Sequence, residues 1–151
     1  MASVIYNQFK KYSADGTIDL DGDTIWIALL MNTTTADTEN DGIEFVADLT
    51  TLGETAGANY VRKALSSLAV NLDDANDRAE FDAADVLFSA LGNGAADIQG
   101  ALIYVDADND GDPADDTLNY VIAFIDFAAD QSPGGSDFTV SWDTQGILQL
   151  A

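Results

Sequence analysis

The sequence of 151 residues contains neither cysteine nor histidine. The absence of thiols excludes disulfides and cysteine nucleophiles, and the absence of imidazoles excludes the Ser-His-Asp triad and the usual zinc and haem ligands. The phosphate-binding patterns GxGxxG and GxxxxGK[ST] are missing as well. Paired carboxylates of the glycosidase kind are uninformative, because among 27 acidic residues some pair always falls at a workable distance. We therefore expect a protein that is not an enzyme and needs no organic cofactor.

Basic residues are scarce, and they are Lys10, Lys11, Arg62, Lys63 and Arg78. These five oppose 27 acidic residues, so the formal net charge is -22, and no basic residue follows Arg78. Binding to nucleic acid or to an anionic membrane depends on Lys and Arg, so we expect neither partner. The mutual repulsion of so many carboxylates has to be screened by salt or cations, which suits a saline environment.

Long apolar runs are also missing, since none approaches the roughly 20 residues that a membrane-spanning helix needs. The first residues, MASVIYNQFKKYS, lack the apolar stretch of a signal peptide. We therefore expect a soluble protein that is made in the cytoplasm. Hydrophobic residues nevertheless make up 47% of the chain, which is enough for a core. The length, without a linker or an internal repeat, predicts one β domain over residues 1–151.

Short apolar stretches separated by turn signals dominate the sequence after the first residues. Strands are predicted, in chain order, at Thr24–Met31, 60–72 (one bent strand or two), 78–83, 85–91, Ile98–Ala107, Leu118–Phe127 and in a closing hairpin of 138–143 with 146–151. The segment Ile43–Glu54 has the spacing of one or two helical turns. About seven to nine short strands predict an all-β fold. We expect an antiparallel β-sandwich or jelly-roll-like domain with a short N-terminal helix or arm.

The N-terminal segment combines apolar and basic residues. Its apolar residues have a helix-compatible spacing between Ser3 and Tyr12, with Ser3 as the candidate N-cap. In so acidic a molecule, a patch that is both basic and apolar is unusual for plain solvated surface. Residues 1–12 are therefore a candidate docking arm, and the alternative is a helix that packs on its own body. The residues predicted to contact a partner or a neighbouring subunit are Val4, Ile5, Phe9, Lys10 and Lys11.

The stretch DADNDGDPADDT, residues 106–117, begins like the calcium loop of an EF-hand. Asp106, Asp108 and Asp110 stand at alternate positions, and Gly111 follows at the place of the sharp turn. The twelfth position holds Thr117 instead of a bidentate Glu, and the flanking segments are strand-like instead of helical. An EF-hand is therefore not expected here.

The same loop still fits a looser calcium site, because calcium needs only several oxygen ligands at about 2.3–2.6 Å. Six Asp within residues 106–116 repel one another, and a divalent cation would relieve that repulsion. The predicted ligands are Asp106, Asp108, Asp110 and Asp112. The alternative is a solvated hairpin loop in a protein that is rich in Asp throughout.

A second, weaker acidic cluster lies in IDLDGDT, residues 18–24. If this segment is extended, the carboxylates of Asp19, Asp21 and Asp23 share one face. The alternative is a strand edge that its charges protect from pairing. The tryptophans, Trp26 and Trp142, both lie in apolar strand patterns, so we expect core packing for each and no ligand cleft.

Several blocks of the sequence stand in the order found in one known family. The chain opens with ASVIYNQFK and GTIDLDGDTIWIALL, and it continues with GANYVRKAL, NDRAEFDAADVLFS, GALIYVDA, YVIAFIDFAADQS and GSDFTVSWDTQGILQLA. Together these blocks cover most of the chain, and it resembles a family of small virion structural proteins of tailed bacteriophages. Two departures stand out: Trp26 replaces a Lys that is frequent in the family, and the segment Asp108–Asp116 is longer and more acidic. No family role therefore transfers to the acidic loop.

The resemblance implies a structural protein of the virion, and a head decoration (cement) protein is the role that we expect. Its partner would be the major capsid protein, and its place the outer surface of the capsid after synthesis in the host cytoplasm. It would form a homo-oligomer, with a trimer as the expected state. Two alternatives stay open: a tail or baseplate component, and a calcium-dependent carbohydrate- or host-recognition module.

Overall fold

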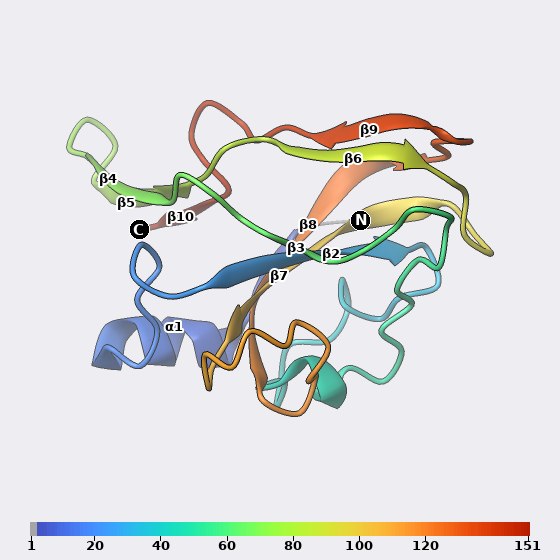
Figure 1. Cartoon of the computed structure of the whole chain (residues 1–151). Helices are drawn as coiled ribbons and strands as arrows, with labels where there is room; N and C mark the ends of the chain where they lie inside the picture. The colour runs from blue at the N-terminus through green and yellow to red at the C-terminus, as the bar shows by residue number, and fades with distance from the viewer. Residues whose placement is uncertain (1–2) are drawn as a thin grey trace.

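The computed structural model describes residues 3–151, which form an all-β protein with one short α-helix (Figure 1). This confirms the predicted class, an antiparallel β-sandwich with a short N-terminal helix. The helix α1 covers Asn7–Asp15, and a 3-10 turn, η1, covers Val46–Asp48. The strands are β1 (Val4–Ile5), β2 (Ile25–Met31), β3 (Lys63–Ala64), β4 (Ala69–Asp73), β5 (Arg78–Asp82), β6 (Val86–Leu91), β7 (Ile98–Asp106), β8 (Asn119–Gln131), β9 (Ser136–Val140) and β10 (Leu148–Leu150).

The largest sheet has the strand order β1-β8-β7-β2-β3, and its neighbouring strands are antiparallel. Its central strand is β7, all of whose residues are buried. The three central strands contain continuous apolar runs (IWIALLM, ALIYV and YVIAF) because both faces of this sheet are covered. Gly100 lies where β7 and β8 approach closely, since a Cβ at this position would be 2.3 Å from the carbonyl oxygen of Ile125. Glycine is therefore required at that point.

Figure 1 shows what covers the two faces of the large sheet. The two smaller sheets, β10-β5-β4 and β6-β9, lie on one side, and α1 lies on the other side with the segment 32–54 and η1. Tyr6 and Phe9, both fully buried, hold the α1 side to the body. The Tyr6 hydroxyl donates a hydrogen bond of 2.9 Å to the carbonyl oxygen of Ala36. The hydrophobic core thus extends on both sides of the large sheet.

The last two strands do not form the predicted hairpin. β9 pairs with β6, whereas β10 pairs with β5 in the other small sheet. Gly146 allows this crossing, because its φ is +82° and a Cβ there would lie 2.4 Å from the Phe81 carbonyl oxygen. The amide of Ile147 donates to that same oxygen at 2.7 Å. Pairing with β5 therefore replaces the local hairpin, of which one isolated bridge between Asp143 and Gly146 is left.

The remaining strand predictions hold with shifted boundaries. The segment 60–72 forms two strands in different sheets, β3 and β4. The segment Ile43–Glu54 contains one turn, η1. β8 continues to Gln131, four residues beyond the predicted end at Phe127, so it is the longest strand among residues 3–151.

The segment around Asp19 turns instead of extending. The amides of Gly22 and Asp23 both donate to the Asp19 carbonyl oxygen, at 3.1 and 2.8 Å. The Asp23 carboxylate in turn accepts a hydrogen bond of 2.8 Å from the Asp19 amide. The predicted extended segment, with Asp19, Asp21 and Asp23 on one face, is therefore wrong.

The N-terminal helix begins at Asn7 and not at Ser3, because Val4 and Ile5 pair with β8 as strand β1. Ser3 is consequently not its N-cap, and the Ser3 hydroxyl accepts a hydrogen bond of 3.1 Å from the Asp126 amide. The N-terminal segment is thus joined to the large sheet before the helix starts. Within residues 3–151, no helix has the length and apolar character needed to cross a membrane.

Candidate functional site

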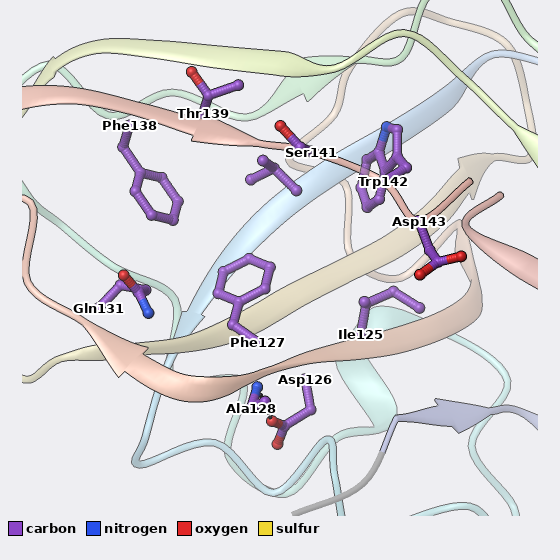
Figure 2. A pocket seen from close by; sticks show the side chains of 11 residues that line it. Ile125, Asp126, Phe127, Ala128, Gln131, Phe138, Thr139, Ser141, Trp142 and Asp143 are labelled. Atoms are coloured by element: carbon purple, nitrogen blue, oxygen red, sulfur yellow. Dashed lines mark hydrogen bonds between the residues drawn. The ribbon is translucent and has the colours of Figure 1, made fainter. Parts of the chain in front are cut away.

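A groove of about 570 Å³ lies between β8 and the end of β9 (Figure 2). Figure 2 shows Ile125 and Phe127 of β8 pointing toward Phe138 and Trp142 on the opposite wall. The ring centroids of Phe127 and Phe138 are 5.9 Å apart. All four side chains are half-buried. The groove therefore has an apolar lining with surface still available for contact.

A bulge in β8 builds one wall of the groove. Between the residue pairs Gly100–Asp126 and Ile98–Gln131, β7 advances by two residues while β8 advances by five. Ala128, within this bulge, has a φ of +62°, and its amide donates to the Asp126 carboxylate at 2.7 Å. Bulges often lie beside functional sites, where they redirect side chains. Here the bulged segment carries Phe127, and Figure 2 shows its ring facing β9 across the groove.

Within residues 3–151, β9 lacks a ladder partner on one side, and so does the part of β8 beyond Phe124. β9 pairs only with β6, and β1 pairs with β8 only at Ala123 and Phe124. An unpaired strand edge presents backbone N–H and C=O groups in a row, which can pair with an extended segment of another chain. The groove thus combines an apolar lining with nearby backbone groups suited to an extended peptide.

The charge around the groove is negative. Asp143 places an exposed carboxylate at one end of the groove, whereas Figure 2 shows the side chain of Asp126 pointing away from it on the other face of β8. No basic residue lies among the lining residues, because the chain has none after Arg78. A ligand that carries Lys or Arg beside apolar residues would complement both the charge and the lining.

The two tryptophans occupy different environments. Trp26 of β2 is half-buried and packs against the hydrophobic core, as predicted. Trp142 also packs against the core, but its ring lines the groove as well. Its indole N–H donates to the Ala84 carbonyl oxygen at 3.1 Å, which fixes the ring. The prediction of a core role is therefore incomplete for Trp142.

Alternating apolar residues in two segments of the sequence are a local signal for this groove. Phe138, Val140 and Trp142 alternate along FTVSWD, and Ile125 alternates with Phe127 in β8. Each set therefore shares one face of its strand. That the two faces oppose each other follows from the stacking of the sheets, which no local pattern encodes.

The predicted docking residues of the N-terminal segment do not form one exposed patch. Phe9 is fully buried in the protein's own core, so it is unavailable for a contact, which corrects this part of the prediction. Val4 and Ile5 are half-buried and pair with β8. Lys10 and Lys11 are exposed on α1. The first two residues of the predicted arm 1–12 lie outside the described part of the chain.

The acidic loop brings three of the four predicted calcium ligands together. Asp106, Asp108 and Asp110 each place one carboxylate oxygen within 4.8 Å of those of the other two. Asp106 is buried, whereas Asp108 and Asp110 are exposed. Asp112 lies outside this group, and its carboxylate accepts a hydrogen bond of 2.9 Å from the Ala114 amide. The structure therefore places a three-carboxylate group at the start of the loop.

Arg62 fastens the other end of the same loop. Its side chain is only 9% exposed, and it binds the carboxylates of Glu54 and Asp116 at 2.7 and 2.6 Å. It also donates to the Pro113 carbonyl oxygen, which accepts a hydrogen bond of 2.8 Å from the Tyr104 hydroxyl as well. Burial raises the pKa of Tyr104, against the opposing effect of the adjacent Arg62. This end of the loop is thus held to the large sheet.

No protein-family model, curated protein or solved structure matches the chain. The features of the structure that bear on function are therefore the groove and the acidic loop. Of these two features, the groove presents the larger apolar surface, and it is the one that suits another protein.

Proposed function

We propose that this protein decorates the head of a tailed bacteriophage. It binds the outer surface of the assembled capsid through the major capsid protein and stabilises the shell without catalysing a reaction. The groove between β8 and β9 carries the proposal, because its lining and its neighbouring strand edges suit an extended segment of another protein. The ordered sequence blocks that resemble phage virion proteins support the choice of the capsid as partner.

The apolar part of the binding comes from the aromatic lining. Phe127, Phe138 and Trp142 are half-buried in the free protein, so a bound segment would complete their burial. Aromatic side chains at the centre of an interface contribute a large share of the binding free energy. The unpaired edge of β9 would add main-chain hydrogen bonds to the same segment.

The charge of the protein restricts the partner further. Asp143 lies at the groove of a chain with a net charge of -22, so an acidic segment would be repelled. A segment with Lys or Arg beside its apolar residues would be attracted and oriented. The docking segment of the major capsid protein in this proposal is therefore extended, apolar and flanked by basic residues.

Stabilisation of the shell would follow from mass action. A protein that binds the assembled lattice and not its separated subunits stabilises the lattice by RT ln(1 + [L]/Kd), where [L] is its free concentration. Three copies around a threefold position of the shell would satisfy closed cyclic symmetry, so a homotrimer belongs to the proposal. The high negative charge keeps unbound copies from associating nonspecifically.

Purified particles of the phage that encodes this chain provide the first test. Quantitative mass spectrometry should find a copy number comparable to that of the major capsid protein, and electron cryomicroscopy should place the density on the outside of the head. A few copies per particle, located on the tail, would overturn the assignment to the head and favour a tail or baseplate component.

Binding of the purified protein to undecorated heads, measured by co-sedimentation, tests the groove. Phe138→Ser and Asp143→Lys should each abolish binding, because the first removes apolar lining and the second reverses the charge. Leu72→Ser and Asp74→Lys are matched controls on exposed positions outside the groove, and Leu72 is 75% exposed. Binding by both groove variants at the level of the controls would contradict the docking site. Calcium-dependent binding to a glycan array, lost in the same variants, would favour carbohydrate recognition instead.

A further inference from the structure

Only one of the two carboxylate oxygens of Asp106 has a hydrogen-bond partner among residues 3–151. Asp106 ends β7 and is 1% exposed. One of its oxygens, Oδ2, accepts a hydrogen bond of 2.9 Å from the Gly111 amide. The other oxygen, Oδ1, is buried and has no hydrogen-bond partner among residues 3–151. A buried carboxylate oxygen without a partner is unfavourable, because it loses its hydration and gains nothing in return.

A second unsatisfied oxygen lies at the same end of the ladder. Asn119 is the residue that pairs with Asp106 across β7 and β8, and its Oδ1 is also buried without a partner in the described part of the chain. Its Nδ2 donates to the Pro113 carbonyl oxygen at 3.2 Å, which identifies Oδ1 as the atom without a partner. Asp106 and Asn119 thus each present a buried oxygen that no donor among residues 3–151 satisfies.

The residues that follow add negative charge to this place. Asp108 and Asp110 are exposed, and each has a carboxylate oxygen within 4.8 Å of the Asp106 carboxylate. Three carboxylates so close together repel one another when all are ionised. A cation bound between them would remove this repulsion and would supply a partner for the unsatisfied oxygen of Asp106.

The spacing of the oxygens suits calcium, whose coordination geometry is less strict than that of magnesium. Oxygens on opposite sides of a calcium ion lie up to about 5 Å apart, because each Ca–O distance is about 2.3–2.6 Å. Magnesium is smaller, demands a near-ideal octahedron and gives up its water ligands reluctantly. Each of the three carboxylates places one oxygen within 4.8 Å of those of the other two, a spacing that calcium can span without rearrangement.

We propose that Asp106, Asp108 and Asp110 bind one calcium ion, with water completing its coordination. The site is weak, because it has three carboxylate ligands and Thr117 stands where a bidentate Glu would strengthen it. A dissociation constant of about 10⁻⁴ to 10⁻³ M is expected for such a site. Since Arg62 already holds Asp116 and Pro113, the ion would fasten the opposite end of the loop. Its role is thus to order the loop and not to take part in the proposed docking groove.

Calorimetric titration of the full chain with calcium chloride tests the site. One ion should bind with millimolar or submillimolar affinity, and the melting temperature should rise more in calcium chloride than in magnesium chloride at the same concentration. The magnesium series is the control for screening, because a chain with a net charge of -22 responds to any divalent cation. Equal shifts in the two salts, or no heat of binding at millimolar calcium, would overturn the proposal.

The variant Asp108→Asn distinguishes calcium binding at a specific site from attraction by the overall charge of the protein. Asp108 is exposed, so its substitution should leave the fold intact while weakening calcium binding by roughly tenfold or more. Asp74→Asn removes the same charge from an exposed turn between β4 and β5 and should bind calcium as the unmodified chain does. An equal loss of affinity in both variants would show that the ion is held only by the overall charge.

Discussion

Replacing Arg62 by Met should lower the free energy of unfolding substantially, because Arg62 joins three segments of the chain. The guanidinium forms a fork with Glu54, with Nε–Oε1 and Nη2–Oε2 distances of 2.7 Å each. It binds Asp116 at 2.6 and 3.3 Å, donates to the Pro113 carbonyl oxygen and lies 5.4 Å from the centroid of the Tyr104 ring. A methionine side chain would fill similar space but would leave both carboxylates without their cation.

The expected loss can be worked out from the exposure of the partners. Removing one member of a buried ion pair costs about 3–5 kcal/mol, because the remaining charge stays buried. The side chains of Glu54 and Asp116 are 23% and 29% exposed, so water reaches them in part and the lower end of that range applies. We therefore expect a loss of about 3 kcal/mol in Arg62→Met. For a chain of this size, that loss corresponds to a fall of about 6–12 °C in melting temperature.

Urea unfolding followed by tryptophan fluorescence, with calorimetric melting beside it, measures the effect. Lys11→Met is the control, because the Lys11–Asp15 pair is 62% and 40% exposed, and an ion pair so open to water contributes little to stability. Adding Glu54→Gln and Asp116→Asn to Arg62→Met should recover part of the loss, since the uncompensated carboxylates then disappear. A loss below about 1 kcal/mol in Arg62→Met, equal to that of the control, would refute the reasoning.

Two further predictions concern how the stability of the whole protein responds to salt and to alkaline pH. Stability should rise with sodium chloride, because salt screens the repulsion within a chain whose net charge is -22, and a melting temperature that falls on adding salt would contradict this. Stability should fall in alkali, because burial raises the pKa of Tyr6 and Tyr60 and a hydrogen bond to Glu44 raises that of Tyr12 to about 12. Their phenol groups stay protonated in the folded chain at a pH where an unfolded chain, with a tyrosine pKa of about 10, loses protons. This contribution is complete below a pH of about 10 and is lost as the pH rises through the folded-state pKa values, so the urea midpoint should hold up to about pH 10 and drop between about pH 10 and pH 12.

The central strands could be predicted because burial on both faces leaves a local mark. β2, β7 and β8 are apolar runs between turn signals, and their predicted positions agree with the structure to within a few residues. The short N-terminal helix was predicted as well, but its start was placed at Ser3 instead of Asn7. Spacing within the segment could not reveal that Val4 and Ile5 pair with a strand more than 100 residues away.

The prediction of a closing hairpin was wrong for a related reason. The segments 138–143 and 146–151 are adjacent in sequence and look like hairpin partners, but each pairs with a different strand elsewhere, β6 for one and β5 for the other. Local turn chemistry favours the nearest strand, whereas burial of Phe81 and Leu148 favours the pairing observed. The free energy of the observed pairing depends on residues far apart in sequence. A short stretch of sequence therefore cannot predict it.

The two candidate sites also differ in how far the sequence alone predicts them. The carboxylates of Asp106, Asp108 and Asp110 were identified from their spacing, since a loop of six residues brings its own ligands together. The groove was not identified, although Phe127, Phe138 and Trp142 each lie in a strand whose alternation was visible. Their meeting depends on the stacking of two sheets and on the bulge at Ala128.

The amino-acid order thus sets the class of the protein, its charge, its central strands and the acidic loop, because each of these follows from composition or from contacts within a few residues. The pairing of the outer strands, the burial of Phe9, the fastening of the loop by Arg62 and the groove between β8 and β9 depend on the folded chain. They arise when segments tens of residues apart compete to cover the same apolar surface. The arrangement that buries the most prevails, and it leaves the aromatic lining between β8 and β9 only half covered.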